Sequence, residues 1–187
     1  MRCRVEVAAL RAEPADDAEQ VTQALAGEPL EVLERLEEWT RVRTAYGYPG
    51  WIRSAALEEG VGELPSASVG SPLEAARTFL GAPYEWGGMT RRGIDCSGLV
   101  HMAYRRAGRL VPRDAWQQAK AASPVGEGVA APGDLVFYGD PGGRADHVAF
   151  WLGDGRILHA TARDGLGVVE EPEPAELRAR RRSLGRL

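Results

Sequence analysis

Cys96 is the residue of this sequence best suited to act as a nucleophile. It lies in the polar string Asp95-Cys96-Ser97, at the predicted start of a helix over residues 96–107 that Gly108 ends. The free N–H groups and the partial positive charge at a helix start stabilise a thiolate. The alternative is an inert cysteine packed in the core, but a polar setting is unlike such a position. We therefore predict a reactive thiol with a lowered pKa.

A nucleophilic cysteine needs a general base, and the chain has only three histidines. His101 follows Cys96 on the same predicted helix and is interpreted as a half-buried surface residue. His147 opens a predicted strand, and His159 lies on the next strand, beyond a Gly-Asp-Gly turn at 153–155. Antiparallel neighbours can bring the two rings into contact. One ring would then act as the base, and the other would hold its tautomer through a hydrogen bond.

The elements that must position these side chains lie after residue 71. A helix over 72–80 is predicted by the N-cap residue Ser71, by Pro72 at the first helical position and by Gly81 after the end. Short strands are predicted over 134–138, 147–152 and 156–160. Helices followed by strands and tight turns indicate an α+β domain over residues 72–187.

The first sixty residues have a different pattern. Polar and apolar residues alternate in four predicted strands, over 4–7, 29–36, 39–44 and 50–53. Period-two patterning with frequent turn residues is typical of a small antiparallel barrel. Residues 61–71 are rich in Gly, Ser and Pro and are interpreted as a linker. The sequence thus predicts two domains, an all-β barrel over 1–60 and the α+β domain.

Composition and charge exclude several classes of protein. The 187 residues carry a net charge of −4, and no apolar run approaches the roughly 18 residues that cross a bilayer. Charged residues stand where a signal peptide would need its apolar stretch, so we expect a cytoplasmic protein, or an exported one if the N-terminus is truncated. The basic cluster 178–182 is interpreted as the solvated surface of a short helix, so no nucleic acid partner is expected.

The two cysteines, Cys3 and Cys96, are too far apart in the sequence to form a disulfide framework, and no CxxC pair could bind zinc. We expect no metal, no cofactor and no protein partner.

Four blocks in this order resemble the NlpC family of bacterial papain-like cysteine peptidases. They are Tyr84-Glu85-Trp86-Gly87-Gly88, Asp95-Cys96-Ser97-Gly98-Leu99-Val100, Gly133-Asp134-Leu135-Val136-Phe137 and His147-Val148-Ala149. The strings 10–14, 21–25 and 47–53 resemble a bacterial SH3-like barrel, which frequently accompanies that family. The implied fold is an SH3-like barrel followed by a papain-like peptidase domain.

The resemblance implies roles for particular residues. Cys96 would be the nucleophile, His147 the base and His159 the polar third member. Tyr84 would line the site and help to stabilise the oxyanion, while Asp95 and Ser97 would line the pocket for a γ-D-glutamyl unit.

The resemblance also implies the substrate. Such enzymes cleave peptidoglycan stem peptides between γ-D-glutamate and a diamino acid, either meso-diaminopimelate or lysine, and some recycle peptides that begin with a free L-alanine. The loop with Arg113 and Asp114 would contact the free amine and the glutamate carboxylate. In the barrel, Glu13 and Tyr48 would add contacts to the amine, although the acidic loop around Glu13 could simply be solvated.

Two other functions compete with this interpretation. The first is an inactive peptidoglycan-binding protein, which would be expected to have lost Cys96 or His147; both are present, so an enzyme is favoured. The second keeps the Cys-His chemistry but makes the protein an amidase, acyltransferase or thioesterase, which the catalytic residues alone do not separate from a peptidase.

Overall fold

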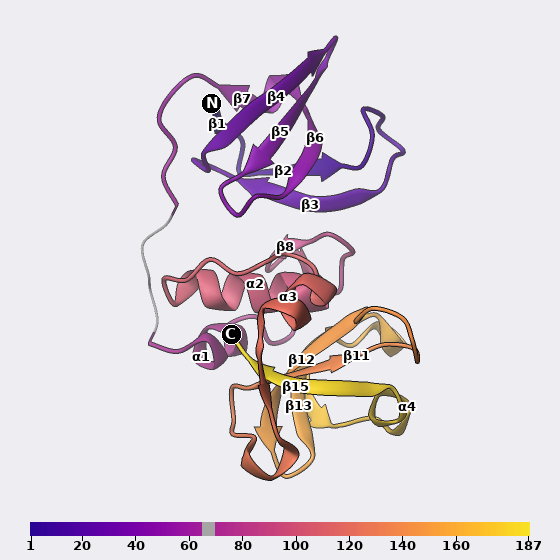
Figure 1. Cartoon of the computed structure of the whole chain (residues 1–187). Helices are drawn as coiled ribbons and strands as arrows, with labels where there is room; N and C mark the ends of the chain where they lie inside the picture. Colours follow the sequence, from indigo (N-terminus) through magenta and orange to yellow (C-terminus); the bar gives the residue numbers. More distant parts are fainter. Residues whose placement is uncertain (65–69) are drawn as a thin grey trace. The chain divides into compact units, whose positions relative to one another are not determined.

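The computed structural model describes residues 1–64 and 70–187, and it contains two compact units. One unit holds the N-terminal part of the chain together with Trp86–Gly88, and the other holds the remaining residues (Figure 1). Residues 65–69 of the predicted linker lie outside the described residues.

The N-terminal unit is all-β. A five-stranded antiparallel sheet has the strand order β3-β2-β6-β5-β4, and a second small sheet pairs β1 with β7. The strands are β1 (Arg2–Cys3), β2 (Val7–Arg11), β3 (Gln20–Leu25), β4 (Leu30–Leu36), β5 (Trp39–Thr44), β6 (Pro49–Arg53) and β7 (Leu57–Glu58).

Three of the four strands predicted by alternation are present, as β4, β5 and β6, and the alternation of buried and exposed side chains is clearest in β5. In β5, Val42 and Thr44 are buried while Arg41 and Arg43 are exposed. The buried side chains of several strands form one core, which includes Leu10, Ala24, Leu30, Val42 and Ile52. The strand predicted over 4–7 is wrong, because Arg4, Val5 and Glu6 connect β1 to β2. Only Val7 of that pattern enters the sheet.

The second unit combines helices with a six-stranded antiparallel sheet. The helices are α1 (Pro72–Arg77), α2 (Cys96–Arg106), α3 (Ala115–Ala121) and α4 (Ala175–Ala179). The strands are β8 (Met89–Thr90), β9 (Gly93–Ile94), β10 (Ser123–Val125), β11 (Leu135–Tyr138), β12 (His147–Gly153), β13 (Arg156–Thr161), β14 (Gly167–Pro172) and β15 (Arg181–Arg186).

The order of the large sheet is β10-β15-β11-β12-β13-β14, and β8 and β9 form a separate hairpin. Strand β15 therefore enters the sheet between β10 and β11, which both precede it by more than 40 residues (Figure 1). The prediction that the basic cluster 178–182 lies on a helix is only partly right. Helix α4 ends at Ala179, and Arg181 and Arg182 begin β15.

Helix α2 is the centre of the second unit. Each of its residues except Arg106 is buried, and the helix packs against α1, β12 and β13. The ring of Tyr104 stacks on that of Phe150 of β12, with centroids 6.4 Å apart. Because α2 is fixed against β12 and β13, its N-terminus has a defined position relative to the start of β12.

Candidate active site

The start of α2 is held by Asp95. This residue is the N-cap of the helix, and its Oδ1 accepts a hydrogen bond from the Gly98 amide at 2.6 Å. Cys96 consequently occupies the first helical position, as the sequence predicts. The backbone N–H groups of the first turn have no carbonyl partner within the helix, so the Cys96 amide can donate to an anionic group.

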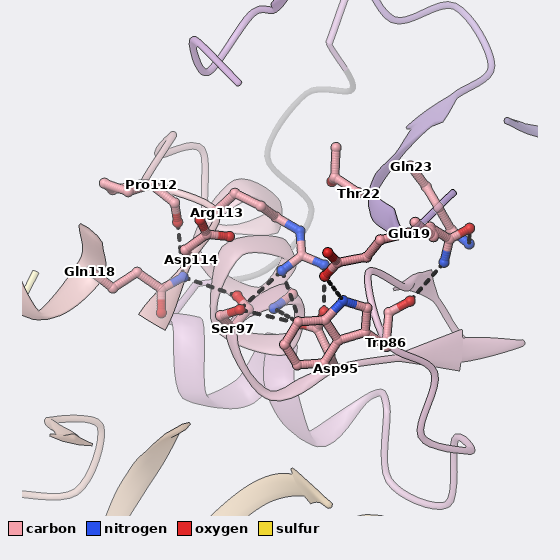
Figure 2. A network of polar contacts seen from close by, with 12 residues as sticks. Glu19, Thr22, Gln23, Trp86, Asp95, Ser97, Pro112, Arg113, Asp114 and Gln118 are labelled. Carbon is pink, nitrogen blue, oxygen red and sulfur yellow. Dashed lines mark hydrogen bonds and ion pairs between the residues drawn. The ribbon is translucent and has the colours of Figure 1, made fainter. Parts of the chain in front are cut away.

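Asp95 is itself paired with a buried arginine. Arg113 Nη2 lies 2.7 Å from Asp95 Oδ2, and Arg113 Nη1 donates to Asp95 Oδ1 at 2.9 Å and to Ser97 Oγ at 3.0 Å (Figure 2). The exposed fractions of the Arg113 and Asp95 side chains are 1% and 7%. Gln118 of α3 donates to the Ser97 and Pro112 carbonyls, which ties the next helix to the same point. Many of the hydrogen bonds in this cluster therefore hold the start of α2, the helix that carries Cys96.

The environment of the thiol contradicts the predicted lowering of its pKa. Cys96 is 5% exposed. Burial, followed by the negative charge of Asp95, raises the pKa of the thiol to about 12, although the Val148 and Ser97 amides hydrogen-bond the sulfur. Loss of hydration outweighs the helix N-terminus, so Cys96 carries its proton at neutral pH. The thiol therefore needs a base at the moment it attacks.

A tight hairpin brings His147 and His159 together. Strands β12 and β13 are joined by Asp154-Gly155, whose φ angles of 50° and 68° are typical of a type I′ turn. His147 Nε2 and His159 Nδ1 lie 2.8 Å apart, and the two rings meet edge to face. The predicted contact between these rings is confirmed. Val148, whose amide reaches the Cys96 sulfur, follows His147 directly, so the thiol and both rings belong to one site.

The charge state of the His147 ring suits it to accept a proton. Burial, together with His159 and Arg180, lowers its pKa to about 3, so the ring is neutral at pH 7. On its other side, Tyr138 of β11 is the direct cross-strand partner of His147, with ring centroids 5.7 Å apart. The Tyr138 hydroxyl donates to Glu173 at 3.0 Å, which fixes the phenol against the imidazole.

Two functional candidates escaped the sequence reasoning, namely Glu171 and Arg163. Glu171 Oε1 lies 2.8 Å from His159 Nε2. Arg163 Nη2 contacts both oxygens of the same carboxylate, at 2.7 and 2.5 Å. The only signal in the sequence is the alternation of Gly167–Pro172, since Glu171 falls two positions after Val169, the cross-strand partner of His159.

Tyr84 lies beside the thiol, as expected. It precedes the β8–β9 hairpin and forms a bridge to Ile94. Burial, then the proximity of Cys96 and Asp95, raises the pKa of its phenol, so the hydroxyl stays protonated and can donate a hydrogen bond.

The remaining predicted residues occupy varied positions. Asp114 is the N-cap of α3, where it forms a capping box with Gln117. Arg113, by contrast, directs its guanidinium to Asp95 and Ser97, and any contact of Arg113 or Asp114 with a substrate stays a prediction. His101 is fully buried and donates a hydrogen bond from Nδ1 to the Val111 carbonyl oxygen at 2.7 Å, so its interpretation as a surface residue is wrong.

Two predicted residues belong to the N-terminal unit. Glu13 is exposed in the loop between β2 and β3, and Tyr48 is half-buried in the turn before β6. In that same unit the indole of Trp86 donates to Glu19 at 2.8 Å (Figure 2). Gln20 Nε2 donates to the Trp86 carbonyl. The roles of Glu13 and Tyr48 in binding stay predictions.

Over residues 1–64 and 70–187, no helix is long and apolar enough to cross a membrane. Within the same described ranges, no group of three or more His, Cys, Asp or Glu side chains is arranged to hold a metal ion.

Comparisons with known proteins agree with this fold. Residues 81–176 match the model of the NlpC/P60 family, and residues 10–57 match that of the bacterial dipeptidyl-peptidase SH3 domain. The chain belongs to the NlpC/P60 family and carries an SH3-like domain before the papain-like domain.

Among curated proteins, a gamma-D-glutamyl-L-lysine dipeptidyl-peptidase of Bacillus cereus is 31% identical over 124 residues, covering 64% of this chain and 37% of that protein. The chain therefore spans little more than a third of that relative. An NlpC/P60 family protein of Bacillus cereus has a similar solved structure, with a TM-score of 0.59, 24% identity and coverage of 99% of this chain and 62% of that one.

A further similar structure is that of RipD from Mycobacterium tuberculosis, described as a non-catalytic NlpC/P60 domain protein adapted to peptidoglycan binding. It has a TM-score of 0.51 and 28% identity, and covers 62% of this chain and 94% of that one. Membership of the family is therefore compatible with both an enzyme and a binding protein.

Proposed function

We propose that this protein is a cysteine peptidase that cleaves the γ-D-glutamyl–diamino acid bond of peptidoglycan stem peptides. The observation that carries the proposal is the complete series of groups from a buried thiol to a neutral histidine and a second, hydrogen-bonded histidine. The gamma-D-glutamyl-L-lysine dipeptidyl-peptidase similar to this chain supports the choice of bond. The diamino acid would be lysine or meso-diaminopimelate.

In the first step, Cys96 Sγ attacks the γ-carbonyl carbon of the glutamyl unit. Its proton passes to the ring nitrogen of His147 that is not bonded to His159. The oxygen of the tetrahedral intermediate would accept hydrogen bonds from the amide at the start of α2 and from the Tyr84 hydroxyl. His147 then gives its proton to the departing amine of the diamino acid.

The thioester left on Cys96 is hydrolysed in the second step. A water molecule attacks the acyl carbon while His147 accepts its proton, and the proton then returns to the sulfur as the glutamyl product leaves. Each cycle begins from a protonated thiol and a neutral imidazole, in agreement with the directions in which burial shifts the two pKa values.

The test is mass spectrometry of digests of L-Ala-γ-D-Glu-meso-diaminopimelate and of the lysine analogue. Release of free diamino acid by the native protein but not by Cys96→Ala is expected, with Cys3→Ala as the matched control that retains activity. Binding of the peptides without cleavage would instead assign the protein to the non-catalytic type that RipD represents. Turnover of an acyl thioester alone would make it an acyltransferase or thioesterase.

We further propose that the enzyme prefers a free N-terminal L-alanine, as in released wall peptides. Support comes from the acidic loop between β2 and β3, since a carboxylate such as that of Glu13 pairs with an ammonium group. A charge-assisted hydrogen bond contributes about 1.5–3 kcal/mol, so acetylation of the amine should lower kcat/KM about tenfold or more. Glu13→Gln should reduce this discrimination, and Glu31→Gln, an exposed control on the same unit, should keep it. Equal rates on free and acetylated peptides would refute the preference.

A further inference from the structure

Behind the two histidines lies a carboxylate held by an arginine. Glu171 is a diagonal neighbour of His159 across β13 and β14, because Glu171 pairs with Ile157 and Val169 pairs with His159. The exposed fractions of the His159 and Glu171 side chains are 1% and 21%. The hydrogen bond between His159 and Glu171 is therefore sheltered from water. Each of the two side chains has a further partner, which is His147 for His159 and Arg163 for Glu171.

The hydrogen-bonding properties of these groups determine which ring nitrogens carry protons. An ionised carboxylate only accepts, so His159 must donate to Glu171 from Nε2. The neutral His159 ring then has a lone pair on Nδ1, and His147 must donate to it from Nε2. The remaining nitrogen of His147, Nδ1, is left with its lone pair. This is the nitrogen that the proposed mechanism needs as a base.

We propose that Glu171, oriented by Arg163, is a positioning residue that sets the tautomers of His159 and His147. The catalytic consequence of this inference rests on the proposed function. The tautomers of the two rings do not depend on which substrate is bound. No proton passes to Glu171, which acts on the reaction only through the two rings. Arg163 contributes by contacting both carboxylate oxygens, and Glu176 and Asp164 contact the same guanidinium from the solvent side.

Glu171→Gln makes the proposal testable, because it changes the hydrogen-bonding pattern and nearly preserves the shape. Arg163 only donates, so it takes the amide oxygen of the new glutamine and turns the amide NH2 toward His159. A donor in that place favours a lone pair on His159 Nε2 and a proton on Nδ1. That proton would face the one on His147 Nε2, and the contact between the rings would be lost.

The first measurement is the ¹⁵N NMR spectrum of the three imidazoles, assigned by replacing each histidine in turn. Native protein should show His147 and His159 with protonated Nε2, and Glu171→Gln should move His159 to the Nδ1-protonated form. In Arg163→Met/Glu171→Gln the amide is free to turn its oxygen to the ring, so the Nε2-protonated form should return. Glu170→Gln is the matched control, since Glu170 bonds Arg77 instead, and its spectrum should equal that of native protein.

The second measurement is peptide hydrolysis. Glu171→Gln should lower kcat about 10- to 100-fold while KM changes less than about twofold, and the double variant should regain part of the loss. The same His159 tautomer in native and Glu171→Gln protein would overturn the inference even if hydrolysis proceeds normally. The expected tautomers in a protein that hydrolyses no peptide would uphold it and overturn the proposed function.

Discussion

The ion pair between Arg113 and Asp95 should be the most sensitive point of the second unit. Arg113→Met removes the guanidinium but keeps most of the apolar stem. It leaves the carboxylate of Asp95, 7% exposed, without its two short contacts from Arg113, and it removes a third contact from Ser97. Breaking a buried ion pair by removing one partner costs about 3–5 kcal/mol, because the other charge stays buried. We expect a loss of that size in the free energy of unfolding of this unit.

Hydrogen–deuterium exchange read by mass spectrometry suits this prediction, since the two units are measured separately in one sample. Some amides exchange only when the whole unit unfolds, and a loss of 3 kcal/mol should raise their exchange rates roughly 100-fold. This increase should appear in peptides from α2. Peptides from β4 and β5 in the N-terminal unit provide the internal reference. Arg77→Met, which breaks an exposed pair with Glu170, should cost no more than about 1 kcal/mol.

A double-mutant cycle tests the cause of the loss. Asp95→Asn keeps an N-cap acceptor for Gly98 but removes the negative charge that the buried Arg113 guanidinium contacts, so it too should be costly. Arg113→Met/Asp95→Asn removes both charges, and its cost should fall short of the sum of the single costs by 1 kcal/mol or more. A loss below about 1 kcal/mol for Arg113→Met, or strict additivity, would refute the argument from buried charge.

Three further predictions concern the histidines and the nucleophile. His147→Ala should lower kcat/KM for diamino acid release as far as Cys96→Ala does, because the base moves a proton in every step; a fully active His147→Ala protein would contradict this. His159→Gln should retain partial activity in the same assay, since an amide can still bond His147 Nε2; complete loss would show that the imidazole itself is required. Burial holds the pKa of His101 near 3, so below pH 6.5 the unfolded chain binds a proton there that the folded protein does not. Urea denaturation at pH 7, 6 and 5 should therefore show stability falling by about 1 kcal/mol more per pH unit in native protein than in His101→Gln, and equal slopes would exclude the effect.

The parts of the site that could be predicted depend on local patterns. Asp95 as a helix cap and the Asp154-Gly155 turn are short-range features, and together they account for the placement of Cys96 and for the contact between His147 and His159. The chemistry of Cys96, His147 and His159 follows from their residue types, since cysteine and histidine are rare in this chain. A reader of the sequence can therefore find the central residues without knowing how the sheet is ordered.

The rest depends on burial and on distant pairing, which local patterns do not report. The helix start at Cys96 predicts a stabilised thiolate, but only the packing around α2 shows that lost hydration dominates its pKa. The burial of His101 is not predicted for the same reason, because it follows from the packing of α2 on nearly all sides. Glu171 could not be singled out among 27 acidic residues until β14 was known to pair with β13.

The order of the large sheet also has a consequence for how the protein is made. Strand β15 pairs with both β10 and β11, so residues 181–186 must leave the ribosome before the sheet can close. Until then, β11 has one row of backbone N–H and C=O groups without its final partner, and such an edge can pair with another nascent chain. Tyr138, which packs against His147, lies on that edge strand. An open β11 edge would therefore favour aggregation over folding until β15 is inserted.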